Sequence, residues 1–146
     1  MEWDSIFPPA SEDQIAGFER ATGIVLPPLY RDFLHSTNGG SPQSERRFVV
    51  DESDEVMLGA LYGIAEDGGA LNLKSVYDDL REWEDFPHEM LPIGEDPGGN
   101  RLLLATRGEN KERIDFWDRV GFIAQRKGRR IFPVAANINA LLAGLR

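Results

Sequence analysis

Residues 26–40, with the sequence LPPLYRDFLHSTNGG, contain the start, the apolar face and the end of one helix in a single stretch. Pro27 and Pro28 suit the first turn of a helix, where the missing backbone N–H of proline leaves no hydrogen bond unmade. The apolar residues that follow share one helix face: Leu29, Tyr30, Phe33 and Leu34. Asn38-Gly39-Gly40 ends the segment because glycine accepts the positive φ found at helix ends. The stretch therefore predicts an amphipathic helix that packs on a core.

A second helix is predicted just before this stretch. Ser11 and Gln14 have the spacing of a capping box, and the acids between them favour the first turn of a helix. Ile15 and Phe18 then recur at helical spacing, and Gly23 supplies a positive φ that ends the helix.

After residue 40 the pattern changes from helix to strand. Residues 46–50 and 55–62 predict two strands, and the acidic turn at 51–54 between them predicts a hairpin. Helical spacing returns after Asn72, a suitable N-cap, and the predicted third helix continues into the charged residues 81–85.

The remaining chain predicts more strands and a closing helix. The strand candidates are residues 91–94, 102–106, 114–117 and 121–124. Residues 131–135 are too short to assign, and Asn137 or Asn139 caps a last short helix. The predicted core contains Phe18, Phe33, Leu34, Ile93, Leu103 and Leu141. This order of elements predicts a single α+β domain over residues 1–146, with a mainly antiparallel sheet and helices packed on one face.

The amino-acid composition indicates the cellular compartment in which the protein is expected. The chain of 146 residues has no cysteine, which fits a reducing compartment and leaves no thiolate ligand for a metal. The N-terminus has no apolar export signal, and no apolar run reaches the roughly 18 residues of a membrane span. We therefore expect a cytoplasmic protein without membrane contact.

Charge is distributed unevenly along the chain. Residues 51–100 hold 14 acids and 2 bases, whereas residues 101–146 hold 4 acids and 10 bases, within a net charge of -9. An acidic field of this size attracts basic partners and repels phosphate backbones, so nucleic acid is not an expected ligand. The basic run at 126–130 can mark nucleic-acid contact, but we interpret it as a solvated hairpin.

No motif in the sequence composes a catalytic site. His35 and His88 are isolated and lack a second ligand at metal-binding spacing. Residues 94–101, GEDPGGNR, have the glycine spacing of a phosphate loop, but Asn100 and Arg101 stand where lysine and a hydroxyl residue are needed. We interpret this loop as a turn between strands. We predict no catalytic residue, no metal and no cofactor, and hence no enzyme.

Several segments together resemble the SMI1/KNR4 (SUKH) family. They are Trp3, Ile6, residues 15–19, 26–34, 38–40, 91–100 and 116–118. The resemblance implies a non-catalytic protein-binding domain. Bacterial members of this family act as immunity proteins that neutralise toxins, often nucleases. Other members are regulatory or scaffold-like domains, including fungal proteins linked to cell-wall synthesis.

The leading hypothesis is an immunity protein whose acidic surface blocks a cognate toxin, for example a basic nuclease domain. The alternative is an endogenous regulatory or scaffold domain, and the oligomeric state stays open. The predicted protein-binding residues are Asp51, Glu52, Asp54, Glu55, Asp78, Asp79, Glu82, Trp83, Glu84 and Asp85. Trp83 or Phe86 is the predicted aromatic anchor among these acids.

Overall fold

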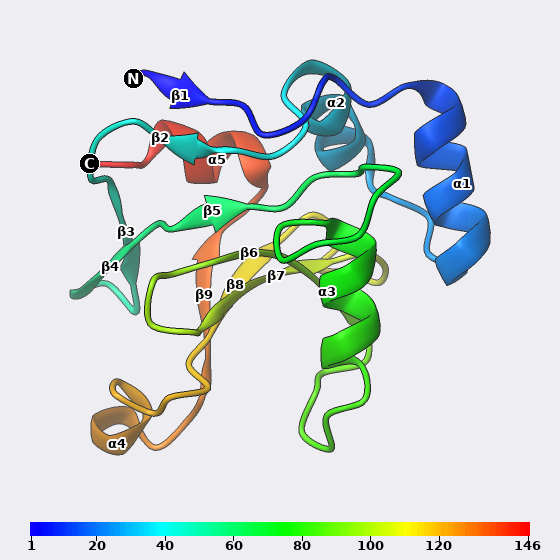
Figure 1. Ribbon diagram of the computed structural model, residues 1–146. Coiled ribbons are helices and arrows are strands. Elements are labelled where there is room, and N and C mark those ends of the chain that lie inside the picture. The colour runs from blue at the N-terminus through cyan, green and yellow to red at the C-terminus, as the bar shows by residue number, and fades with distance from the viewer.

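A five-stranded antiparallel sheet forms the centre of the computed structural model, which describes residues 1–146 (Figure 1). Its strands, in spatial order, are β5 (Ala60–Leu61), β6 (Met90–Glu95), β7 (Arg101–Ala105), β8 (Ile114–Trp117) and β9 (Ile131–Ala135). Two small antiparallel pairs accompany it: β1 (Trp3–Asp4) with β2 (Ser41–Pro42), and β3 (Arg47–Val50) with β4 (Asp54–Met57). The helices are α1 (Glu12–Thr22), α2 (Pro28–Ser36), α3 (Leu73–Leu80), α4 (Ala124–Lys127) and α5 (Ile138–Ala143). The predicted α+β class with a mainly antiparallel sheet is confirmed.

The helix boundaries follow the local signals in the sequence. The backbone N–H of Gln14 donates to Ser11 Oγ at 3.1 Å, and the Ser11 N–H donates to Gln14 Oε1 at 2.9 Å, which completes the capping box. Gly23 ends α1 with a φ of 74°. Asn72 caps α3 and Asn137 caps α5 through their side-chain oxygens. These predicted helix boundaries are confirmed. They could be predicted from the sequence because each depends on residues within one helical turn.

The segment Asn38-Gly39-Gly40 does more than follow a helix. The Asn38 side chain is buried and donates to the carbonyl oxygens of Pro8 and Ile64, and its Oδ1 accepts from the Ile64 N–H. Gly40 has a φ of 129°, and a Cβ there would lie 2.3 Å from the Asp4 carbonyl oxygen. The segment therefore ties the N-terminal strand to the chain that enters the central sheet.

Both faces of the central sheet are covered. Leu102 and Leu103 are successive residues on β7, point to opposite faces, and are each 0% exposed. On one face Phe48 of β3 lies edge-on to Phe116, with ring centroids 5.8 Å apart. On the other, Trp117 contacts Phe86, which follows α3, at 6.0 Å. A strand buried on both faces is expected to be continuously apolar, which is the pattern of β7 after Arg101. In β8 the one charged residue, Asp115, is buried and accepts hydrogen bonds from Arg113.

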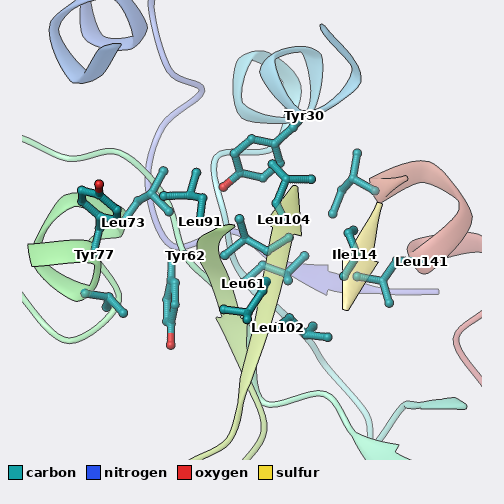
Figure 2. Close-up of a cluster of buried hydrophobic side chains, with 14 of the residues drawn as sticks. Tyr30, Leu61, Tyr62, Leu73, Tyr77, Leu91, Leu102, Leu104, Ile114 and Leu141 are labelled. Carbon is teal, nitrogen blue, oxygen red and sulfur yellow. The ribbon is translucent and has the colours of Figure 1, made fainter. Parts of the chain in front are cut away.

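One hydrophobic cluster joins the sheet to the helices (Figure 2). Tyr30 of α2, Tyr77 of α3 and Leu141 of α5 all contribute to it, together with sheet residues such as Leu104 and Ile114. The predicted core residues Phe18, Phe33, Leu34, Ile93, Leu103 and Leu141 are all buried. The prediction of one core is confirmed.

The third helix is shorter than predicted. It ends at Leu80, and residues 81–85 form turns in which the Trp83 N–H donates to the Leu80 carbonyl oxygen at 3.0 Å. The turns bring Phe86 back against Tyr77 and Trp117, where it is 3% exposed. Burial of this ring favours ending the helix, and it excludes Phe86 as an exposed anchor.

Two strand predictions are wrong, and one segment without a predicted structure is a strand. Residues 55–62 are not one strand, because the chain leaves β4 at Met57 and joins the central sheet at β5. Residues 121–124 form a turn into α4 rather than a strand, because the Asp118 carboxylate accepts hydrogen bonds from the backbone N–H groups of Gly121, Ile123 and Ala124. Residues 131–135, for which the sequence predicts no element, form strand β9.

No helix combines the length and the apolar character needed to cross a bilayer.

Candidate protein-binding surface

The predicted interface residues fall into two groups on different parts of the molecule (Figure 1). The hairpin group lies on the β3–β4 hairpin: Asp51, Glu52, Asp54 and Glu55. The α3 group lies on α3 and the turns after it: Asp78, Asp79, Glu82, Trp83, Glu84 and Asp85. Figure 1 shows the hairpin and α3 on opposite sides of the central strands. The two groups therefore do not form one continuous acidic surface.

Most of the hairpin group is paired with bases of the same chain. Asp51 lies 2.6 Å from Arg129 and 3.4 Å from Lys127, and Asp54 lies 2.6 Å from Arg126. These bases belong to α4 and the residues after it, so their interpretation as a solvated hairpin is wrong. Because their charge is already offset, these carboxylates have less to offer a basic partner than their number suggests.

The α3 group is exposed and mostly unpaired. Asp78 forms an ion pair with Lys74 at 2.5 Å, one helical turn away. The other carboxylates of the group form no ion pair and lie on the surface: Asp79, Glu82, Glu84 and Asp85. Asp78 and Glu82 are four residues apart but do not share a helix face, because α3 ends between them. This group keeps its negative charge available to a partner.

Trp83 stands among these acids as a half-exposed aromatic side chain. It is 47% exposed, and the Arg119 guanidinium carbon lies 3.7 Å from its ring centroid. The same guanidinium is 5.4 Å from the ring of Trp117. Such cation–π contacts hold an arginine and a tryptophan in fixed relative positions. Burial, and then the charge of Arg101, hold the pKa of Arg119 below its ordinary value.

A groove of about 660 Å³ lies beside Trp83. Side chains of α3 form one wall, and Glu95, Arg101 and Arg119 come from the central sheet and the loop after β8. Glu95 lies opposite Arg101 in the β6–β7 register, and its Oε1 accepts a hydrogen bond from the Tyr62 hydroxyl at 2.8 Å. Burial raises the pKa of Tyr62 well above its ordinary value, so the hydroxyl keeps its proton.

Sequence reasoning missed these groove residues. Arg101 opens β7 and Arg119 lies in the connection after β8, and only the antiparallel pairing of β7 with β8 brings them together. The one local signal is Arg101 itself, a charged residue that opens an otherwise apolar strand. A second feature that was missed is the exposed apolar pair Val120 and Phe122, which are 61% and 81% exposed on the connection to α4.

Residues 94–101 and His35, which were considered as sites of chemistry, have structural roles. The Asp96 carboxylate accepts hydrogen bonds from the Gly98 and Asn100 backbone and from the Asn100 amide, as expected of a turn between strands. His35 Nδ1 lies 2.8 Å from the Ala10 carbonyl oxygen and His35 Nε2 lies 2.7 Å from Glu12. The structure places no group of three or more His, Asp or Glu side chains where they could hold a metal ion.

Comparison with known proteins gives one family. The model of the SMI1 / KNR4 family (SUKH-1) matches residues 9–144. No curated protein and no solved structure matches the chain. The matched range runs from before α1 to the end of α5, and so includes the α3 group, the groove and the whole central sheet.

Proposed function

The chain belongs to the SMI1/KNR4 family (SUKH-1), and from this premise we propose that it is a non-enzymatic protein-binding domain that acts in the cytoplasm as an immunity protein against a bacterial toxin. The α3 group carries the proposal, because it combines an exposed tryptophan with unpaired carboxylates beside a groove. Interfaces of this kind use a central aromatic anchor for affinity and surrounding charges for fast, selective encounter.

The charge of the α3 group supports a basic partner. A nuclease must bind phosphates and therefore presents a basic cleft, and an acidic inhibitor can occupy that cleft in place of nucleic acid. The hairpin group supports this role less, because Asp51 and Asp54 already contact bases of the same chain. The proposed interface is therefore centred on residues 78–85 and not on residues 51–55.

Co-expression tests the immunity role directly. We expect the chain to restore growth of cells that express the C-terminal domain of a toxin encoded beside its gene, whereas an empty vector does not. If the folded chain fails to protect against any adjacently encoded toxin, the immunity role is wrong and the regulatory or scaffold alternative stands. Cells that survive because the toxin is not made are recognised by immunoblotting for the toxin domain.

Neutralising the α3 group is expected to slow binding without unfolding the domain. The variant carries Asp78→Asn, Asp79→Asn, Glu82→Gln and Glu84→Gln, which takes the net charge from -9 to -5. The association rate with the toxin domain at low salt should fall about tenfold, and its salt dependence should flatten. The free energy of unfolding should change by less than about 1 kcal/mol, because exposed ion pairs contribute little. Stopped-flow association at two salt concentrations measures the effect.

A matched variant separates local charge from total charge. It carries Glu2→Gln, Asp13→Asn, Asp32→Asn and Glu109→Gln, four exposed acids outside the α3 group, and has the same net charge. It should retain most of the wild-type association rate. An equal loss of association rate in both variants would mean that the total charge of the protein, and not the α3 group, steers the partner. Unchanged association rates in both variants would place residues 78–85 outside the interface.

A further inference from the structure

Two arginine side chains meet at the groove without a carboxylate partner. Arg101 Nη1 donates to the Gly99 carbonyl oxygen at 2.7 Å, and Arg119 Nη1 donates to the same oxygen at 3.3 Å. Their only other side-chain hydrogen bond is a longer one from Arg101 to the Asn100 carbonyl oxygen. Two positive groups therefore lie side by side, and the backbone oxygens around them offset only part of their charge.

Both guanidinium groups are held in place and keep free donors. Arg119 is stacked 3.7 Å from the centroid of the Trp83 ring, and the Nε atoms of Arg101 and Arg119 are shielded from solvent. The Nη2 atom of each arginine donates no hydrogen bond within the protein. A ligand oxygen that reaches these donors would meet side chains whose conformational freedom is already restricted, which lowers the entropic cost of binding.

The neighbouring charges select the kind of anion. Asp79 and Glu95 line the same groove, and Asp85 lies close enough to Arg119 to oppose the lowering of its pKa. These carboxylates would repel a phosphate dianion more strongly than a group with one negative charge. A carboxylate carries one charge and matches the planar fork of a guanidinium.

The groove also offers apolar surface beside the arginines. Val76 and Leu80 of α3 line it together with Trp83. This surface suits the chain that flanks an acidic side chain better than it suits a free inorganic anion. We propose that the groove binds a carboxylate side chain of a partner polypeptide, held between the guanidinium groups of Arg101 and Arg119. The proposal rests on the protein-binding function above and deepens it, since the partner would present an acid within its basic surface.

The test uses a short peptide in place of the toxin, so that it can fail independently of the immunity role. The probes are Ac-Gly-Glu-Gly-NH2 and its neutral match Ac-Gly-Gln-Gly-NH2, followed by NMR of the Trp83 indole N–H and the arginine side-chain N–H signals. We expect saturable shifts with the glutamyl peptide, with a Kd on the order of 10 mM, and none with the glutaminyl peptide. Equal responses to both peptides, or no saturable shift with the glutamyl peptide, would overturn the proposal.

Variants and a second anion locate the site. Arg101→Gln and Arg119→Gln should each abolish the saturable shifts, whereas Arg107→Gln, which changes an exposed arginine paired with Glu89, should leave them unchanged. Amide spectra establish whether each variant is folded. If only one of the two groove variants folds, that variant alone tests the proposal. Retained binding in a folded groove variant would contradict the assignment. If inorganic phosphate binds saturably and more tightly than the glutamyl peptide, the groove is a phosphate site and the proposed carboxylate site is wrong.

Discussion

Alanine at Trp83 is expected to raise the dissociation rate of the toxin complex about 30- to 1000-fold, while the association rate changes less than tenfold. Trp83 is 47% exposed and lies at the centre of the α3 group, where a partner would bury its remaining surface. Its loss removes contact area and also releases Arg119, which stacks on the ring. Both effects act after the encounter, so they change dissociation more than steering. Surface plasmon resonance measures the two rates.

Two further variants make this result specific. Trp83→Phe keeps an aromatic ring and should give an intermediate dissociation rate. Val25→Ala removes an apolar side chain that is 74% exposed in the segment between α1 and α2, outside the α3 group, and should leave both rates unchanged. If Trp83→Ala dissociates at the wild-type rate from a toxin that the chain still binds, Trp83 lies outside the interface.

Alanine at Phe33 is expected to lower the free energy of unfolding by about 3 to 5 kcal/mol. The ring is 6% exposed and stacks on Tyr30, with centroids 6.0 Å apart. Truncation removes the buried surface of a phenylalanine and leaves a cavity that α2 can close only in part. Urea unfolding followed by circular dichroism gives the free energy of unfolding of the variant and the parent.

The same substitution at an exposed site supplies the control for this prediction. Phe122→Ala removes a ring that is 81% exposed and should change the free energy of unfolding by less than about 0.5 kcal/mol. A neutral result for Phe33→Ala would mean that α2 presents a different face to the core. An equally large loss at Phe122 would mean that the loop after β8 is packed in solution.

The two acidic groups show that the number of carboxylates is a poor measure of a binding surface. Asp51 and Asp54 lie in as acidic a stretch of sequence as Asp79 and Glu84. The hairpin, however, brings Asp51 and Asp54 against bases of α4 and of the residues after it, which offset their charge. In the α3 group only Asp78 forms an ion pair, with Lys74, and Arg119 contacts the group through the ring of Trp83 rather than through a carboxylate. Part of the acidic charge of residues 51–100 therefore pairs with bases of the same chain, and the rest lies on a surface that a partner can reach.

Much of the fold could be predicted from the sequence because its signals are local. The capping box at Ser11, the terminating Gly23 and the apolar spacing around Phe33 each act within about one helical turn. The strands at 91–94, 102–106 and 114–117 could be predicted because short, mainly apolar runs between turn residues favour strands whatever they pair with. The family resemblance rests on these same segments and is confirmed by the match to residues 9–144.

The candidate site could be predicted only in part. The sequence alone predicted an exposed group of acids with Trp83 or Phe86 beside them, because charged residues are rarely buried, and of the two rings only Trp83 is exposed. It did not predict that α3 ends at Leu80, or that Asp51 and Asp54 meet bases of α4 and of the residues after it. It also did not predict that Arg101 and Arg119 donate to the same Gly99 carbonyl oxygen. Each of these depends on residues far apart in the chain, whose meeting is set by strand register and by the burial of rings such as Phe86. The local propensities of the residues carry no information about such contacts, because the contacts form, and stabilise the fold, only after the strands have paired.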